Sequence, residues 1–223
     1  MPVRYQMISL TEENYLKAIY HLSEDGSKAV LTNDLAEAMH TKAASVTDMI
    51  KKLSLKEFIS HEKYYGVNIT PKGKAVALSV IRKHRLWETF LVQKLSFSWD
   101  EVHEVAEQLE HIQSNRLIEK LDEYLGFPKT DPHGDPIPDS NGKIKALQKV
   151  MLSTLSPGSD SLIVAVKDSD SKLLKYLDKI GARPGKKIKV IDREEYDGSM
   201  EVSINSQRFF LSKEVSENIL VTA

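Results

Sequence analysis

Histidine and glutamate side chains recur at helical spacing between residues 103 and 111. His103 and Glu107 lie four residues apart, and Glu110 and His111 follow Glu107 by three and four residues. On one continuous helix these four side chains would share a face about 100° wide, beside a separate apolar face. Imidazole and carboxylate groups together suit Mn²⁺, Fe²⁺, Co²⁺ or Zn²⁺, and the oxygen-rich set favours Mn²⁺ or Fe²⁺. The alternative is an exposed acidic helix with incidental histidines.

Two further features of the same region favour a bound cation. Glu104, Glu107 and Glu110 place like charges three residues apart, and each such pair costs a few tenths of a kcal/mol without a counter-ion. His84 and Glu88, upstream in the chain, repeat the spacing of four residues. A divalent cation would relieve the repulsion between the carboxylates.

The composition bounds the class of protein. The 223 residues are 41% hydrophobic and 28% charged, which is typical of a soluble globular protein. The absence of cysteine excludes disulfides, thiolate zinc fingers, iron–sulfur clusters and cysteine nucleophiles. No apolar run approaches the roughly 18 residues that span a bilayer, and the first ten residues do not resemble a signal peptide. We therefore expect a cytoplasmic protein without a membrane partner.

The net charge of −1 conceals an uneven distribution. Residues 42–85 contain ten Lys and Arg against three Asp and Glu, an excess of seven positive charges. Residues 96–140 contain eleven Asp and Glu against three Lys and Arg, an excess of eight negative charges. The basic block suits phosphates and the acidic block suits cations, unless both are chance clusters of solvated charge.

The elements before residue 75 are expected to carry the basic block. Ser9 and Glu12 have capping-box spacing and open a helix, and Thr32 can cap a second, short helix. A third helix follows a break at residues 40–42, and residues 58–70 form two short strands that Pro71 and Gly73 close. The buried positions expected on the third helix are Val46, Met49, Ile50 and Leu53. This order is typical of a winged helix-turn-helix.

The third helix of such a unit enters the major groove of DNA, and its hairpin contacts the backbone. Small and basic residues at the start of this helix allow a close approach, and Asp48 can accept from cytosine. The alternative is a small helical domain with a solvated basic face. The candidate DNA-binding residues are Thr41, Lys42, Ser45, Thr47, Asp48 and Lys51 on the helix and Lys63, Tyr64 and Tyr65 on the hairpin.

Beyond this unit the sequence predicts helices and then strands. We expect helices over residues 75–95, 99–112 and 115–125, a turn-rich segment over 126–138 and a short helix over 144–152. From residue 161, short strands with Gly and Asn turns predict a small barrel of about sixty residues, with a short helix near Leu173. The apolar stripe on the first of these helices indicates a homodimer, because its residues need a partner surface: Leu78, Ile81, Phe90 and Leu91.

Three motifs together resemble the diphtheria-toxin-repressor family of metal-dependent regulators. They are RKHRLWE at residues 82–88, VHEVAEQLEH at 102–111 and DPHGDPIP at 131–138. The C-terminal part is similar to the SH3-like barrel, of the ferrous-transport-A type, that many members carry. The resemblance implies a mainly α fold with β. Its expected parts are a winged helix-turn-helix DNA-binding domain (1–74), a helical metal-binding and dimerisation domain (75–140), a linker (141–158) and an SH3-like β-barrel (159–223).

The family's primary metal site is implied here by residues of the first two motifs and by the N-terminal helix. Members usually have Asp or Met where this chain has Asn14, and the manganese branch often has Glu where this chain has Lys17. Iron-responsive members carry Cys at the position of Glu107, which points to the manganese branch. The implied primary ligands are Asn14, His84, Glu107, Glu110 and His111.

The resemblance also implies a second site, made of the Glu of the first motif, the loop motif and a barrel acid. Carried over, its ligands are Glu88, Asp131, His133 and Asp168. His103 belongs to an alternative ancillary arrangement with His84 and Glu88. For Asp168 the alternative is a structural role, in which it caps the Leu173 helix together with Asp170.

These observations predict a metal-dependent DNA-binding transcriptional regulator, not an enzyme, that represses metal-uptake genes. Its expected partners are a double-stranded DNA operator and a second copy of itself, with no small-molecule substrate. Its expected cofactor is Mn²⁺ or Fe²⁺, with Zn²⁺ or Co²⁺ as substitutes in vitro. One alternative is a metal-independent winged-helix regulator whose barrel is a protein-interaction module. A metallohydrolase is disfavoured, because no His-Glu-x-x-His helix is present.

Overall fold

The computed structural model describes residues 8–62, 65–145, 148–167 and 170–223. The chain forms two compact units. The first unit comprises Met1–His84, Glu110–Gln113 and Pro138–Lys143, and the second comprises Arg85–Leu109, Ser114–Ile137 and Ile144–Ala223. Three of the predicted site residues, Lys63, Tyr64 and Asp168, lie outside the described residues.

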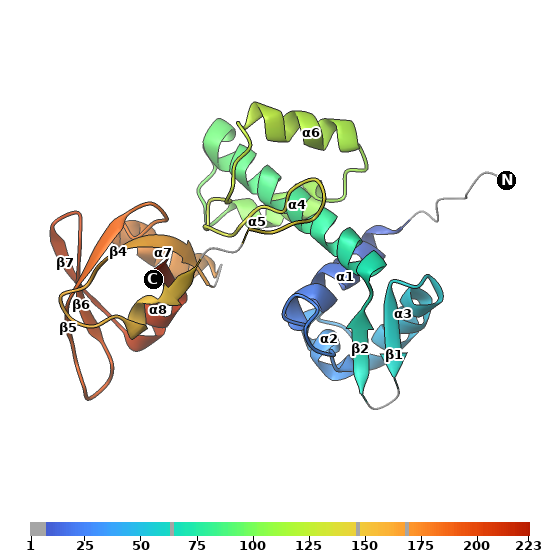
Figure 1. Ribbon diagram of the computed structural model, residues 1–223, viewed down its shortest axis with the longest axis horizontal. Helices are drawn as coiled ribbons and strands as arrows, with labels where there is room; N and C mark the ends of the chain where they lie inside the picture. Colours follow the sequence, from blue (N-terminus) through green and yellow to red (C-terminus); the bar gives the residue numbers. More distant parts are fainter. Residues whose placement is uncertain (1–7, 63–64, 146–147, 168–169) are drawn as a thin grey trace. The chain divides into compact units, whose positions relative to one another are not determined.

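The first unit contains three helices and a hairpin in the predicted order (Figure 1). These are α1 (Leu10–Leu22), α2 (Thr32–Ala38), α3 (Ala43–Leu55), β1 (Ile59–Glu62) and β2 (Gly66–Ile69). The strands pair antiparallel, with Ile59 opposite Ile69. The predicted winged helix-turn-helix is thereby confirmed.

The start of α1 is confirmed, but the start of α2 is not. The Oγ of Ser9 accepts from the backbone N–H of Glu12 at 3.3 Å, and the Glu12 carboxylate accepts from the Ser9 N–H at 2.7 Å. At α2 the capping residue is Leu31, which has no side-chain acceptor. The prediction that Thr32 caps this helix is wrong, because Thr32 is already its first helical residue.

The helix α4 (Pro71–Leu95) begins four residues earlier than predicted. Pro71 starts the helix, where its missing N–H leaves no hydrogen bond unmade. Within α4, a Cβ on Gly73 would lie 2.0 Å from the carbonyl oxygen of Phe58, so only glycine allows this close approach. The hairpin therefore ends just before Pro71, as predicted, whereas Gly73 lies within the helix that follows.

The apolar faces of these elements meet in the core of the first unit. On α3 the buried residues are Val46, Ile50 and Leu53, as predicted, whereas Met49 is half-buried. The other fully buried side chains include Leu16, Ile19, Leu35 and Val67.

The second unit contains α5 (Val102–Leu109) and α6 (Asn115–Tyr124), packed with the C-terminal part of α4. The predicted helix over 99–112 is shorter than expected, because α5 ends at Leu109. The chain turns at Glu110 and His111, and both residues belong to the first unit. The four predicted ligands between residues 103 and 111 therefore do not lie on one continuous helix.

The C-terminal part of the second unit is a six-stranded antiparallel sheet with two helices (Figure 1). The strand order is β3-β8-β4-β5-β6-β7. Its strands are β3 (Lys149–Met151), β4 (Asp160–Val166), β5 (Lys187–Arg193), β6 (Met200–Ile204), β7 (Gln207–Leu211) and β8 (Ile219–Thr222), and its helices are α7 (Ser171–Ile180) and α8 (Lys213–Asn218). The predicted small SH3-like barrel is confirmed.

One local prediction for this region is wrong. Residues 149–151 form β3 and residues 152–154 a 3₁₀ turn, where a helix over 144–152 was expected. The strand forms because β8, at the far end of the chain, pairs with it, and neither β8 nor α8 was anticipated. Asp170 caps α7, with its carboxylate accepting from the N–H groups of Lys172 and Leu173.

Among the described helices, none has the length and apolar character needed to cross a membrane.

Candidate metal centres and nucleic-acid surface

The first unit brings together Glu13, His84, Glu110 and His111, which we call the first cluster. Glu13 lies on α1, His84 on α4, and the other two follow the end of α5. The Nδ1 of His84 lies 2.6 Å from Glu110 Oε2, and the Nδ1 of His111 lies 2.6 Å from Glu13 Oε2. Gln113 donates from Nε2 to the other Glu13 oxygen at 3.1 Å. Three distant stretches of the sequence thus meet in one buried group of carboxylates and imidazoles.

Two lysines also face the first cluster. Lys17 donates from Nζ to both oxygens of Glu110, at 2.9 and 2.7 Å, and Lys83 Nζ lies 3.8 Å from Glu13 Oε1. Burial acts to raise the pKa of Glu110, but the His84 hydrogen bond and the Lys17 charge outweigh it and lower that pKa. Burial lowers the pKa of Lys83, against the attraction of Glu13 and Glu110. The ionised form of Glu110 is therefore favoured, whereas burial disfavours the charged form of Lys83.

The second unit brings together Glu88, Asp131 and His133, which we call the second cluster. All three are buried, and their potential ligand atoms lie within 4.8 Å of one another. Glu88 lies on α4, and the other two lie in the turn-rich segment after α6. The backbone N–H groups of His133 and Asp135 donate to Asp131 Oδ1 at 2.8 and 3.0 Å. The aspartate thus shapes the loop that carries the histidine.

The orientation of the His133 ring follows from its second nitrogen. His133 Nε2 donates to the backbone carbonyl of Trp99 at 2.7 Å, because a carbonyl oxygen can only accept. The Trp99 ring stacks on the imidazole at 5.8 Å. The other nitrogen, Nδ1, lies 3.7 Å from Glu88 Oε2 and is the one available to a ligand.

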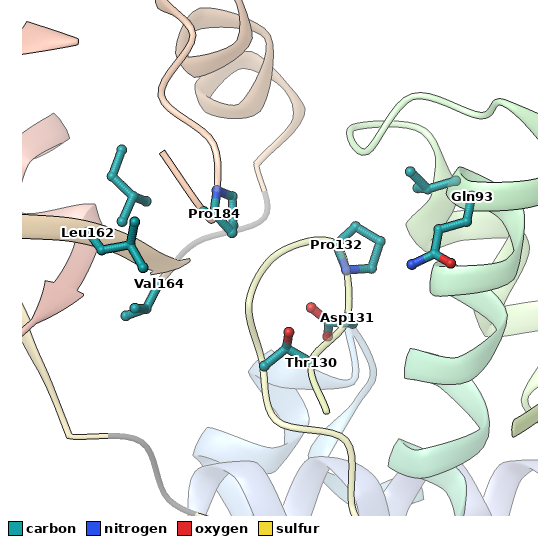
Figure 2. Close-up of a pocket in the computed structure, with 10 residues that line it drawn as sticks. Gln93, Thr130, Asp131, Pro132, Leu162, Val164 and Pro184 are labelled. Carbon is teal, nitrogen blue, oxygen red and sulfur yellow. The ribbon is translucent and has the colours of Figure 1, made fainter. Parts of the chain in front are cut away.

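The loop of the second cluster rests on β4. Val166 donates its N–H to the carbonyl of His133 at 2.9 Å, and a Cβ on Gly134 would lie 1.9 Å from the Val164 carbonyl oxygen. A pocket of about 450 Å³ opens beside this contact (Figure 2). Figure 2 shows Asp131 and Pro132 on the loop side and Leu162 and Val164 on the strand side. The position of the loop thus depends on a glycine.

The second cluster has an unbalanced negative charge. Burial raises the pKa of Asp131 to about 7, with further contributions from the charges of Glu88 and Asp135, while Arg85 opposes the shift. The Arg85 Nε lies 3.5 Å from Asp131 Oδ2. Burial lowers the pKa of His133, but the Glu88 hydrogen bond and the Asp131 charge outweigh it and raise that pKa. The protonated forms of Asp131 and His133 are therefore favoured in this cluster.

Next to the second cluster, His103 lies between two carboxylates. Its Nδ1 is 3.5 Å from Glu88 and its Nε2 is 3.5 Å from Glu107. Hydrogen bonds to Glu107 and Glu88 raise the pKa of His103 to about 9. The Glu107 side chain is 53% exposed. His103 is consequently protonated at neutral pH and neutralises part of the charge of Glu88.

The predicted DNA-reading residues of α3 share its exposed side. Thr41, Lys42, Ser45, Thr47, Asp48 and Lys51 are all exposed. Lys51 Nζ lies 3.0 Å from Asp48 Oδ1, so the acid on this surface is neutralised within the helix. Tyr65, on the hairpin, is 73% exposed. The described part of the predicted surface is therefore accessible to a nucleic acid.

Sequence models of three known domains match successive parts of the chain. Residues 7–67 match the domain described as "Iron dependent repressor, N-terminal DNA binding domain". Residues 70–139 match "Iron dependent repressor, metal binding and dimerisation domain", and residues 150–223 match the FeoA domain. The chain belongs to the iron-dependent repressor family. This family contains transcriptional repressors and not enzymes, as the sequence predicted.

Individual members of the iron-dependent repressor family are similar over much of the chain. The regulator MntR of Bacillus pumilus is 30% identical over 143 residues, which cover 64% of this chain and 94% of MntR. The repressor IdeR of Mycobacterium tuberculosis is 34% identical over 128 residues, so the match spans only 55% of IdeR. A solved manganese-dependent transcriptional repressor in complex with manganese has a TM-score of 0.84 at 35% identity, covering 95% of this chain and 99% of its own.

The structure assembles part of the ligand set that the family resemblance implied. Of the implied primary ligands, His84, Glu110 and His111 meet in the first cluster. On α1 the residue that contacts His111 is Glu13. The implied ligand Asn14, the next residue along the chain, is half-buried. The implied ligand Glu107 pairs with His103. Of the implied second site, Glu88, Asp131 and His133 meet in the second cluster. Asp168 lies outside the described residues.

Sequence reasoning overlooked Glu13, although the sequence contains a signal for it. Glu13 precedes Leu16 by three residues and Tyr20 by seven, which places it on the buried stripe of α1. A carboxylate at such a position requires a partner, because an unpaired buried charge is costly. The pattern therefore shows that Glu13 needs a partner but does not identify it.

The residues of both clusters fit a divalent metal ion. Each cluster offers imidazole nitrogens and carboxylate oxygens, a set typical of Mn²⁺, Fe²⁺ and Zn²⁺ sites. In the second cluster burial, together with the charges of Glu88 and Asp135, raises the pKa of Asp131, and a cation would offset both effects. Solved relatives of this family include ScaR with bound Cd²⁺ and ScaR with bound Zn²⁺. The choice of metal is therefore not fixed by the donor atoms alone.

Proposed function

We propose that this chain is a divalent-metal-dependent transcriptional repressor that binds an operator in double-stranded DNA as a homodimer. The observation that carries the proposal is the composition of the first cluster. Glu13 belongs to the part of the chain that matches the DNA-binding domain, whereas His84, Glu110 and His111 belong to the part that matches the metal-binding and dimerisation domain. A metal ion held by the first cluster would therefore contact residues of both domains.

The proposed mechanism follows from this shared set. A divalent cation would supply positive charge between the carboxylates and imidazoles of the first cluster. Glu13 would then hold α1 to His111, and His84 would hold α4 to Glu110, in one arrangement. In a dimer, holding α1 in one position sets the distance between the two α3 helices. This distance must match the spacing of the DNA half-sites, which is about 34–36 Å or a multiple of it. Metal and DNA binding are then coupled reciprocally.

We propose Mn²⁺ or Fe²⁺ as the physiological ion, with Zn²⁺ or Co²⁺ able to substitute in vitro. The oxygen-rich donors of both clusters support this choice, since carboxylate oxygens suit Mn²⁺ better than they suit softer ions. Several solved relatives are titled as manganese regulators. The predicted ligands Asn14, Glu107 and Asp168 remain proposals. Uptake of the same metal is the proposed target of repression.

The proposed dimer surface differs from the apolar stripe that the sequence singled out. Leu78, Ile81 and Leu91 are at most 5% exposed within the chain itself, so these residues need no partner. Exposed apolar side chains occur instead on and after α6, namely Leu117 at 42%, Tyr124 at 63% and Phe127 at 56%. We assign the homodimer contact to this surface, because exposed apolar patches mark interaction sites.

We propose that α3 reads the operator and that the hairpin contacts its backbone. The exposed residues of α3 include Lys42 and Lys51, which suit phosphates, and small side chains that allow close approach. The next lysine of α3, Lys52, instead lies 3.3 Å from Glu12 Oε1 on α1. The domain boundaries at residues 74, 140 and 158 and a cytoplasmic location also remain proposals.

The decisive experiment compares DNA binding with and without metal. Sites are first selected from a pool of random DNA duplexes in the presence of Mn²⁺, and affinity for the selected duplex is measured by fluorescence anisotropy. We expect Mn²⁺ or Fe²⁺ to raise the affinity about tenfold or more relative to chelator. We also expect the affinity to fall steeply as the salt concentration rises. The replacement Lys42→Ala should reduce the slope of log affinity against log salt concentration by about one.

The same experiment separates the proposal from its rival. Equal affinity in chelator and in Mn²⁺ would favour a metal-independent winged-helix regulator whose barrel binds another protein. A flat salt dependence would contradict DNA binding by the basic surface. Lys213→Ala, which removes a barrel lysine that is 60% exposed, serves as the control for Lys42→Ala.

A further inference from the structure

Lys17 contacts both oxygens through which Glu110 could bind a metal ion. Its Nζ donates to both carboxylate oxygens of Glu110, at 2.9 and 2.7 Å. The Glu110 side chain is 1% exposed, so these oxygens have little access to water. An ion approaching Glu110 therefore finds both oxygens already bound to an ammonium group.

The charges of the first cluster balance without a metal ion. Its two carboxylates, Glu13 and Glu110, are matched by two ammonium groups, Lys17 and Lys83. A divalent ion added to this arrangement would leave an excess of two positive charges at short range. One ammonium group must therefore withdraw, or the ion binds against its repulsion.

Lys17 is the ammonium group that can withdraw. The side chain of Lys83 is 8% exposed, and its Nζ is 3.8 Å from Glu13. The side chain of Lys17 is 16% exposed and lies on α1, so its four-carbon stem has a route to solvent. Withdrawal of Lys17 removes one hydrogen bond from each oxygen of Glu110, although Oε2 still faces His84 Nδ1, whereas withdrawal of Lys83 removes neither bond.

We propose that Lys17 is a resident cation of the first cluster, which holds Glu110 in the metal-free protein and releases it when a divalent ion binds. The exchange of ammonium for metal has two consequences. It keeps a buried carboxylate paired when metal is scarce, and it raises the metal concentration at which the cluster fills. The inference rests on the proposed function, since it assumes that the first cluster binds metal.

The test measures Mn²⁺ binding by the full-length protein in the absence of DNA. Equilibrium dialysis gives the affinity and the number of ions, and thermal unfolding in chelator gives the stability of the metal-free state. Lys17→Gln removes the charge but keeps a polar side chain. We expect about tenfold tighter Mn²⁺ binding, because the competing charge is gone. We also expect a lower Tm in chelator and a larger rise of Tm on adding Mn²⁺.

Two further variants make the test specific to Lys17. Lys17→Arg keeps the charge in a head group that grips carboxylates with two parallel hydrogen bonds, so we expect Mn²⁺ binding weaker than in the wild type. Lys28→Gln removes the exposed ion pair with Glu24 in the same unit and should change neither quantity. Lys17→Arg also gives an answer if Lys17→Gln fails to fold.

The possible results distinguish the inference from the proposed function. If the wild-type protein binds no Mn²⁺, Fe²⁺ or Zn²⁺ in dialysis, the proposed function fails. If the wild type binds Mn²⁺ but a folded Lys17→Gln binds it equally or more weakly, the inference alone is overturned. Mn²⁺ binding by Lys17→Arg that equals or exceeds that of the wild type overturns it as well.

Discussion

Glu110 in the first cluster and Asp131 in the second are both buried, yet their pKa values shift in opposite directions. The pKa of Glu110 is lowered, because His84 and Lys17 outweigh the effect of burial. The pKa of Asp131 is raised to about 7, because burial and the neighbouring carboxylates Glu88 and Asp135 outweigh Arg85. Burial alone therefore does not set the charge state of either group.

The difference lies in the supply of positive charge. In the first cluster each carboxylate lies near an ammonium group, Glu110 near Lys17 and Glu13 near Lys83, and the pKa of Glu110 is lowered. In the second cluster Glu88 and Asp131 lie near a third acid, Asp135, and face one guanidinium group and two histidines, so the pKa values of Asp131 and of both histidines are raised. We infer that metal competes with a lysine at the first cluster and with protons at the second.

The largest expected effect comes from neutralising Glu110. Glu110→Gln leaves Lys17 and His84 without their shared carboxylate and removes a central donor of the first cluster. We expect the metal dependence of DNA binding to disappear, a loss of about tenfold or more in affinity at saturating Mn²⁺. Fluorescence anisotropy with the selected duplex measures this loss.

The matched control for this variant is Glu104→Gln, which neutralises an exposed glutamate on α5. It should bind DNA like the wild type. If Glu110→Gln keeps the full response to Mn²⁺, the first cluster is not the regulatory site. The difference in charge between the two clusters would then not explain the metal dependence of DNA binding.

An intermediate effect is expected at Asp131 in metal-free protein. Because its folded-state pKa of about 7 exceeds the ordinary value of 3.8, the folded state binds more protons between these pH values. The free energy of unfolding therefore falls as the pH rises from about 4 to 7. Above pH 7 the full cost of burying the ionised carboxylate is present. Asp131→Asn removes the charge and keeps an oxygen for the N–H groups of His133 and Asp135.

We expect Asp131→Asn to stabilise the chelator-treated protein at pH 8 by about 1–3 kcal/mol, with the gain shrinking as the pH is lowered towards 4. Thermal unfolding across this pH range provides the measurement. The same variant should lose the rise of Tm that Mn²⁺ produces through the second cluster. A gain that is independent of pH would show that the charge of Asp131 is not the cause.

The smallest effect is expected at His103. Its pKa is raised to about 9 by Glu107 and Glu88, so its stabilising contribution is complete below pH 6.5 and is lost as the pH rises through 9. The side chain is 45% exposed, and water screens the interaction. His103→Gln should lower the stability of metal-free protein at pH 6 by less than about 1 kcal/mol and leave it unchanged near pH 10. A larger loss at pH 10 than at pH 6 would contradict this assignment.

Much of the fold could be predicted because its signals are local. The capping box at Ser9, the apolar spacing on α3 and the alternation in β6 depend on neighbouring residues, and all appear in the structure. The errors occurred where a distant segment decides the outcome. Residues 149–151 form a strand because β8 pairs with them, although the local pattern indicated a helix.

The metal sites were predictable only in part, for the same reason. Residue types and spacing identified Glu110 and His111, but they assumed a continuous helix, which ends at Leu109. The choice of Glu13 over Asn14 depends on which face of α1 meets His111. The contact between Lys17 and Glu110 joins residues 93 positions apart, and nothing in the spacing indicates it.

By itself the sequence determined which chemical groups this protein has for binding metal and DNA, and which helices and strands carry most of them, because periodicity and charge are properties of neighbouring residues. Only the tertiary structure decided which of these groups meet. Neighbouring charges then decided the direction of each pKa shift: His84 and Lys17 outweigh burial and lower the pKa of Glu110, whereas burial and two further carboxylates raise the pKa of Asp131. Electrostatic interactions depend on distance in space, which separation along the chain does not give.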